Sequence, residues 1–137
     1  MMDPVSLTCL ALTVYFEARS EPVQAQAAVA QVVLNRVEHD AFPDTVCEVV
    51  EQGSPEGDAL PTRYACQFSW RCDGKSDKPR NLESYLEAWA VAQHVIAGYL
   101  DGGIGSATDY HATYVQPGWR LAYEPVSQVG THIFYVR

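Results

Sequence analysis

The chain has 137 residues, a length at which one hydrophobic core is stable and two would each be marginal, so we expect residues 1–137 to form a single domain. Its 47% hydrophobic and 19% charged residues exclude a disordered or fibrous protein. The net charge of -8, from 17 acidic and 9 basic residues, argues against a nucleic-acid partner and provides no attraction to anionic membranes.

The first predicted element is a helix over residues 7–19, with Ser6 as its N-cap. Its apolar positions recur at helical spacing, at Leu7, Leu10, Ala11, Val14, Tyr15 and Ala18. Asp3 stands where a signal peptide would carry a positive charge, and no small-x-small cleavage site follows. Glu17 interrupts the apolar stretch well before the ~20 residues that a membrane span needs. We therefore expect neither a signal peptide nor membrane insertion.

A second helix is predicted from Pro22, because proline cannot continue the first helix but suits the first position of a new one. Ser20 or Glu21 would cap it, and a sharp corner would join the two helices. Its apolar stripe consists of Ala25, Ala28, Val29, Val32, Val33 and Val37. A short third helix is predicted over residues 44–52, closed by Gly53.

Residues 53–81 are rich in proline and glycine but contain a dense aromatic cluster, which is typical of an ordered loop that shapes a binding site. The chain has four cysteines, Cys9, Cys47, Cys66 and Cys72. They form no CxxC pair, so a zinc ribbon is not expected, and their even number favours disulfides. All three pairings remain open, as does the alternative of buried free thiols.

Asn81 is placed to cap a fourth helix, which we predict to be closed by Gly102 and Gly103 and to be the central support of the fold. Its expected apolar stripe consists of Leu86, Trp89, Ala90, Gln93, Ile96, Ala97 and Leu100. Two β-prone runs near the end of the chain, LAYEPVSQV and THIFYVR, predict a small C-terminal hairpin that turns at Gly130. The fold class is therefore α+β and predominantly α.

Glu17 is the strongest candidate for chemistry, because it lies in the last turn of an otherwise apolar helix. Partial burial and the negative end of the helix dipole both disfavour a carboxylate there, so we expect a raised pKa for Glu17. A carboxyl group of this kind can act as a general acid near neutral pH. The alternative is a structural ion pair with Arg19 or Arg36.

Six sequence blocks in order, YFEARSEP, QAQAAVAQVVLNRV, FPDTVCEVV, CQFSWRCDG, YHATYVQPGW and VGTHIFYV, resemble the SleB/CwlJ-type cell-wall hydrolase family, which includes spore cortex-lytic enzymes. The resemblance covers about residues 7–136. It implies a lysozyme-like fold with about four helices. It also implies cleavage of the MurNAc-GlcNAc glycan backbone of peptidoglycan, with Glu17 as the catalytic residue. The chain departs from the usual motif at Ser20, where the family has glycine, and this puts the geometry of that turn in doubt.

Members of the family resemble lytic transglycosylases, in which one Glu serves first as acid and then as base while the muramic acid 6-hydroxyl closes a 1,6-anhydro ring. By this resemblance Glu17 would act alone. A lysozyme-type muramidase would instead need a second carboxylate about 5 Å away for retention, or about 6.5 to 9.5 Å away for inversion. Glu21, which could equally be a capping residue, is the first candidate, followed by Asp58, Asp73 and Asp109.

We expect the substrate to be held by residues that offer flat apolar rings or hydrogen-bonding groups, namely Gln67, Phe68, Ser69, Trp70, Tyr110 and His111. Trp119 could add a further stacking surface. The alternative for Phe68 is a place in the core, and the alternative for Tyr110 and His111 is loop packing. Asn35, Arg36 and His132 are expected to be structural.

Two rival hypotheses come from other classes. A Cys-His amidase or peptidase would use Cys9, Cys66 or Cys72 as nucleophile, and His111 or His132 as base. An inactive module would only bind glycan. His94, His111 and His132 show no HExxH-like spacing, so neither a metal nor another cofactor is expected.

The expected partner is peptidoglycan alone, bound by a monomer acting in the cell wall or periplasm. Since we expect no signal peptide, two routes to that substrate remain open. The protein is either a phage endolysin released through holin pores or the mature form of an exported enzyme.

Overall fold

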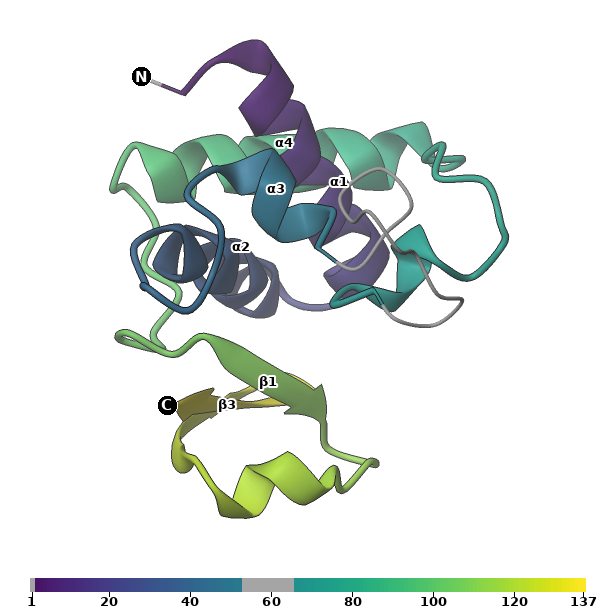
Figure 1. Ribbon diagram of the computed structural model, residues 1–137. Coiled ribbons are helices and arrows are strands. Elements are labelled where there is room, and N and C mark those ends of the chain that lie inside the picture. Colours follow the sequence, from purple (N-terminus) through teal and green to yellow (C-terminus); the bar gives the residue numbers. More distant parts are fainter. Residues whose placement is uncertain (1, 53–65) are drawn as a thin grey trace.

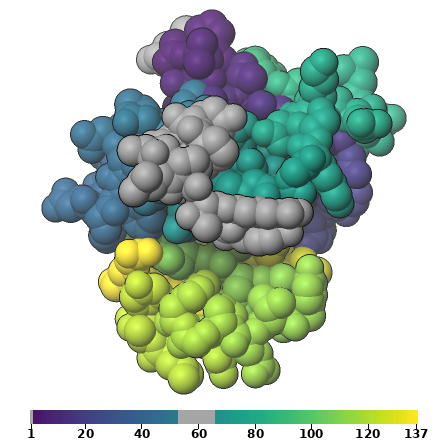
Figure 2. Space-filling view, turned by 45° about the vertical axis from the view of Figure 1, so that its right-hand side comes forward, coloured from purple at the N-terminus to yellow at the C-terminus, as the bar shows by residue number. Residues whose placement is uncertain are grey.

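The computed structural model describes residues 2–52 and 66–137. Figure 1 shows a group of helices lying above a small β-sheet, and Figure 2 shows the sheet region as a separate lobe beneath the helical one. The predicted α+β, predominantly α fold is confirmed. The helices are α1 (Pro4–Ala18), α2 (Val23–Val37), α3 (Val46–Val50) and α4 (Leu82–Ile96), with short 3-10 turns at Ser69–Arg71 and Gly118–Leu121.

Helix α1 begins earlier than predicted. The carboxylate of Asp3 accepts a hydrogen bond from the backbone N–H of Ser6 at 2.9 Å, and Pro4 occupies the first turn. The prediction of Ser6 as N-cap is therefore wrong, because the Asp-Pro pair just before it already supplies a cap and a preset backbone angle. The predicted apolar stripe is otherwise confirmed, with Leu10, Ala11, Val14, Tyr15 and Ala18 buried.

Helix α2 is the central helix of the fold. It is buried around most of its circumference and packs against α1, α3 and α4. The prediction that the fourth helix would be the central support is wrong, because the many alanines of α2 let neighbouring elements approach it from several sides. No side chain caps α2, so neither Ser20 nor Glu21 fills that predicted role.

Helix α4 has the predicted N-cap but a different buried face. The Asn81 side chain accepts from the backbone N–H of Ser84 at 3.0 Å. The buried residues are Ala88, Val91, Ala92 and Val95, whereas Leu86 of the predicted stripe is 58% exposed. The face with small side chains packs against α1, because small side chains permit close helix packing. The predicted face, with its larger aromatic and leucine side chains, is therefore not the buried one. The helix ends at Ile96, before the predicted Gly102 and Gly103.

The predicted C-terminal hairpin is confirmed, and it turns at Gly130, whose φ of 59° favours glycine. Its strands are β2 (Glu124–Val129) and β3 (His132–Val136). The structure adds an unpredicted strand, β1 (Asp109–Ala112), which pairs with β3 and gives the antiparallel order β1-β3-β2. A four-residue strand is too short for its alternation to be recognised in the sequence.

Two disulfides and two hydrophobic clusters hold the elements together. Cys9 and Cys47 link α1 to α3, and Cys66 and Cys72 close the loop that contains the first 3-10 turn. One cluster fills the space among the helices, and the other joins α2 to the sheet through Ala28, Val32, Ile104, Ala107 and Phe134. The second cluster fixes β1 near the C-terminal end of α1. None of the described helices has the length and apolarity needed to cross a bilayer.

Candidate active site

Glu17 lies where the helical lobe meets the sheet. It is in the last turn of α1, partly buried, and its carboxylate accepts a hydrogen bond from the hydroxyl of Tyr110 on β1. Tyr110 reaches Glu17 because its strand neighbour Phe134 is anchored against α2. The geometry therefore brings together two residues that the sequence analysis selected separately.

The pKa of Glu17 is raised above its usual value. Burial is the main cause, and it outweighs two opposing effects, the hydrogen bond from Tyr110 and the positive charge of Arg36. Burial and the negative charge of Glu17 raise the pKa of Tyr110 in turn, so its hydroxyl keeps its proton and remains a donor. A protonated carboxyl group that accepts a hydrogen bond from the Tyr110 hydroxyl is suited to donating its proton to an oxygen atom of a bound substrate.

Arg36 is the cation of this site. Its side chain is 5% exposed, its Nε donates to the carbonyl of Thr108 at 2.7 Å, and its guanidinium lies over the rings of Phe42 and Phe68. Its Nη1 is buried and has no hydrogen-bond partner among residues 2–52 and 66–137. Sequence analysis classed Arg36 as structural. An arginine within a run of small apolar residues was the only signal that it is buried.

Glu21, the predicted second acid, is bound to the sheet. Its carboxylate accepts a hydrogen bond from the Thr131 hydroxyl, at the turn between β2 and β3. Its negative charge also acts on His132, whose pKa is lowered mainly by burial. The His132 ring packs against Tyr110 with ring centres 5.0 Å apart. Glu21 thus has a partner of its own, whereas His132 packs on Tyr110 and its buried Nδ1 has no hydrogen-bond partner among the described residues.

Two of the other carboxylates considered as second acids, Asp109 and Asp73, also have partners in the structure. Asp109 is paired with Arg137 at 2.8 Å and bonded to the Thr108 hydroxyl. Asp73 accepts from the backbone N–H of Lys75 in a separate loop. Asp58 lies outside the described residues, as does Gly53, the predicted end of the third helix.

The aromatic rings of the loop of residues 66–72 do not form the sugar-binding surface that the sequence predicted. Phe68 is 1% exposed and packs in the core under Arg36, so its ring offers no surface to a sugar. Trp70 is 6% exposed and stacks on Phe16, the residue before Glu17, with ring centres 4.8 Å apart. Gln67 and Ser69 are exposed, so their polar groups remain available for hydrogen bonds.

His111 does not share the site with Tyr110. Successive side chains of a strand point to opposite faces of the sheet, so His111 faces away from Glu17. Its ring is buried, stacks on Tyr135, and places Nε2 2.7 Å from the Tyr135 hydroxyl. Trp119 lies edge-on to the same ring on that face. The expectation that Tyr110 and His111 both bind the sugar therefore fails for His111.

Two rival chemistries find little support in the described part of the chain. All four cysteines are in disulfides, so a Cys-His enzyme would lack its thiol nucleophile. Nowhere in residues 2–52 and 66–137 do three or more His, Cys, Asp or Glu side chains gather closely enough to hold a metal ion. Acid-base catalysis by a carboxyl group needs neither a thiol nor a metal ion.

Comparison with known proteins gives concordant matches. The family model described as cell wall hydrolase matches residues 20–135, beginning just after Glu17. A spore cortex-lytic enzyme of Oceanobacillus iheyensis is 32% identical over 130 residues, which are 91% of this chain and 39% of that protein. The chain thus spans about two fifths of the length of this relative.

Two solved structures have the same fold. The catalytic domain of the Bacillus cereus SleB protein has a TM-score of 0.75 and 28% identity, covering 99% of this chain and 93% of that one. The catalytic domain of the germination-specific lytic transglycosylase SleB from Bacillus anthracis has a TM-score of 0.72 and 28% identity, covering 98% and 97%.

Proposed function

The chain belongs to the cell wall hydrolase family, and we propose that it cleaves the glycan strands of peptidoglycan as a lytic transglycosylase, with Glu17 as acid and then base. The observation that carries this proposal is the placement of Glu17, a carboxyl group of raised pKa at the junction of the two lobes, held by Tyr110. The similarity to the Bacillus anthracis protein, a lytic transglycosylase, supports the same reaction class.

In the proposed reaction, protonated Glu17 gives its proton to the glycosidic oxygen between MurNAc and GlcNAc. The bond from that oxygen to the anomeric carbon of MurNAc breaks, and Glu17 becomes a carboxylate. The carboxylate then takes the proton of the muramyl 6-hydroxyl, whose oxygen attacks the anomeric carbon and closes a 1,6-anhydro ring. Glu17 is protonated again, so one carboxyl group completes the cycle and no water is consumed.

Tyr110 and Arg36 would assist the step in which Glu17 is charged. The Tyr110 hydroxyl donates to the carboxylate, and the buried guanidinium of Arg36 adds a positive charge nearby. Both groups favour the ionised form against the cost of burial. Their effect is too small to cancel that cost, so the resting acid keeps a raised pKa.

A two-carboxylate muramidase is the second candidate, favoured only by the closeness of Glu21 to the site. Such an enzyme would need a free second carboxylate to activate water or to attack the sugar. Glu21 accepts from Thr131 at the turn between β2 and β3, and Asp109 is paired with Arg137, so these contacts of both carboxylates lie outside the Glu17–Tyr110 pair. We therefore favour the route with Glu17 alone.

The place of action that fits this function is the peptidoglycan outside the cytoplasmic membrane. Disulfides form and persist in oxidising surroundings, and the chain has two. Release as a phage endolysin and export as a bacterial enzyme both remain predictions, and so does the monomeric state.

The test combines product analysis with three variants. Purified protein is incubated with sacculi, and the soluble products are identified by mass spectrometry. We expect anhydromuramyl ends, lighter by one water than reducing ends. Glu17→Gln should lower the rate by about 10²- to 10⁴-fold while binding to sacculi is retained. Glu21→Gln and the exposed control Glu38→Gln should keep most of the activity.

Three outcomes would contradict parts of this assignment. Reducing ends, together with loss of activity in Glu21→Gln, would indicate the two-carboxylate mechanism. Full activity of Glu17→Gln would exclude Glu17 as the acid. Binding without any product from the unaltered protein would indicate an inactive glycan-binding module.

A further inference from the structure

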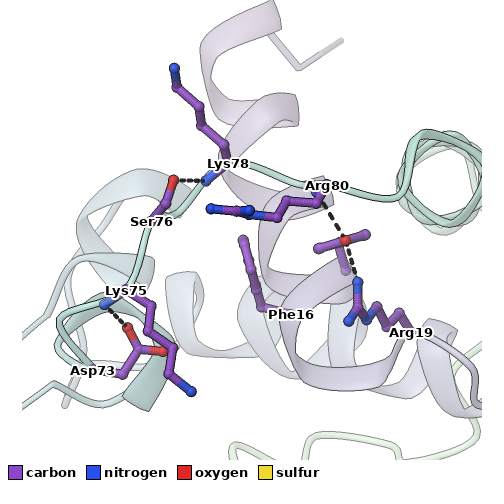
Figure 3. Close-up of a pocket in the computed structure, with 8 residues that line it drawn as sticks. Phe16, Arg19, Asp73, Lys75, Ser76, Lys78 and Arg80 are labelled. Carbon is purple, nitrogen blue, oxygen red and sulfur yellow. Dashed lines mark hydrogen bonds between the residues drawn. The ribbon is translucent and has the colours of Figure 1, made fainter.

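A positively charged pocket lies beside the end of α1, on the side of Phe16. It has a volume of about 390 Å³ and is lined by Tyr15, Phe16, Arg19, Asp73, Lys75, Ser76, Lys78 and Arg80. Figure 3 shows its basic side chains coming from the end of α1, from the loop after Cys72 and from the residue just before Asn81. The proposed reaction does not use this pocket, although Tyr15, Phe16 and Arg19 belong to the YFEARSEP block.

The charge of the pocket is opposite to that of the whole protein. Four of the nine basic residues of the chain line it, with one acidic residue, Asp73, in a protein of net charge -8. Within the described part of the chain, no carboxylate lies within salt-bridge distance of Arg19, Lys75, Lys78 or Arg80. Among the described residues the positive charge is therefore not neutralised by ion pairs, and it provides a local attraction for an anion.

The frame of the pocket is fixed by the hydroxyl of Tyr15. This buried oxygen accepts hydrogen bonds from the Arg19 guanidinium and from the backbone N–H groups of Arg80, at 3.2 Å, and Asn81, at 3.1 Å. The contacts tie the start of α4 to the end of α1. The Arg19 guanidinium and the backbone of Arg80 are thus held in place before any ligand binds, which lowers the entropic cost of ordering this part of the pocket.

The pocket is adjacent to the proposed acid along the chain. Phe16, which forms part of its wall, directly precedes Glu17, and consecutive Cα atoms are about 3.8 Å apart. In peptidoglycan the muramyl sugar next to the cleaved bond carries a short peptide. Four extended residues of such a peptide span roughly 13 Å, which is more than three times the spacing between the Cα atoms of Phe16 and Glu17.

We propose that this pocket binds the carboxylate groups of the peptide stems of peptidoglycan, an inference that rests on the proposed glycan cleavage. Guanidinium groups match a carboxylate with two parallel hydrogen bonds, and the two lysines add flexible point charges. The stem is attached to the sugar held at Glu17, so its effective concentration at the pocket is high. Phosphate groups of other wall polymers have no such fixed position relative to the cleaved bond.

The test compares two double variants of exposed residues on chemically altered substrates. Lys75→Gln/Arg80→Gln removes two charges, and Lys75→Arg/Arg80→Lys retains them at the same positions. The substrates are soluble peptidoglycan strands with free peptide carboxylates, the same strands with those carboxylates amidated, and strands stripped of phosphate polymers. The affinity of Glu17→Gln for each substrate measures the contribution of the pocket to binding in the absence of cleavage.

We expect amidation to raise the KM of the unaltered protein about three- to tenfold with little change in kcat. The charge-removing variant should show this higher KM on both free and amidated strands, and the charge-retaining variant should behave like the unaltered protein. Stripping of phosphate should have no effect. An equal response to amidation in all three proteins, or an effect of phosphate stripping alone, would overturn the inference. Absence of cleavage on every substrate would instead refute the proposed function, while the binding of Glu17→Gln would still test the pocket.

Discussion

At the scale of single residues, the pKa of Glu17 depends on a balance between burial and two favourable neighbours. Burial raises this pKa, and the Tyr110 hydroxyl and Arg36 charge lower it by smaller amounts. Since the proposed acid must be protonated in the first step, activity should fall as the pH rises through this pKa. Tyr110 therefore shifts the upper pH limit of activity, which burial of Glu17 mainly sets, without contributing a proton.

Replacing Tyr110 with Phe keeps the ring against His132 and Phe134 but removes the hydrogen bond to Glu17. Because that bond lowers the pKa of Glu17, its loss should raise the pKa further. The alkaline limb of the profile of kcat/KM against pH should consequently move to higher pH. The measurement is that profile for the unaltered protein and Tyr110→Phe.

Tyr99→Phe is the matched control, because Tyr99 is 84% exposed. Its pH profile should coincide with that of the unaltered protein. A limb that stays in place in Tyr110→Phe, or moves to lower pH, would contradict the role of the Tyr110 hydroxyl.

At the scale of elements, the corner between α1 and α2 begins directly after the helical turn that carries Glu17. Ser20 sits in this corner with a φ of 72°, and it is the sole non-glycine residue of positive φ in the described ranges. A side chain in this left-handed region costs about 1–2 kcal/mol, and glycine avoids that cost. The departure of Ser20 from the glycine of the family motif therefore has a physical cost.

Ser20→Gly should stabilise the protein by about 0.5–1 kcal/mol, because relief of the left-handed strain exceeds the added flexibility of the unfolded chain. The free energy of unfolding from urea titration measures this change. Ser106→Gly, at an exposed turn residue without positive φ, should instead be slightly destabilising. Equal effects of the two substitutions would show that Ser20 is not strained.

At the scale of the whole molecule, the segment between α4 and β1 crosses α2 and joins the two lobes. Gly102 makes the closest approach, because a Cβ at this position would lie 2.8 Å from Cβ of Gln31 and 3.0 Å from Cα of Ala28. These neighbours belong to the central helix and cannot move independently of it. The position of the sheet relative to Glu17 thus depends on a residue without a side chain.

Gly102→Ala should destabilise the protein by about 1–3 kcal/mol through overpacking against α2. Because the crossing segment leads into β1, activity per folded molecule should fall as well. Gly118→Ala is the control, since a Cβ there meets nothing within 4 Å. Thermal melting and cleavage rates measure the two effects, and an unchanged melting temperature in Gly102→Ala would contradict the close contact.

Local patterns in the sequence were sufficient for the features that depend on nearby residues. The Asn81 cap, the stripe of α1 and the Gly130 hairpin each depend on a few adjacent side chains or on one backbone angle. Glu17 was selected because a carboxyl group interrupts an apolar helix and matches a family motif. The direction of its pKa shift also follows from those neighbours, since burial of a carboxyl group always disfavours its charge.

Features that depend on residues far apart in the chain were decided only by the tertiary structure. Tyr110 meets Glu17, and His111 turns away from it, because β1 pairs with β3 in one register, which a four-residue strand does not reveal. Phe68 was assigned to the sugar surface, but Arg36 and the core enclose it. The basic pocket combines the end of α1 with the loop before α4, and only packing around the Tyr15 hydroxyl brings them together. Sequence by itself therefore singled out the proposed acid, whereas long-range packing determined its neighbours, because contacts between distant segments leave no local pattern.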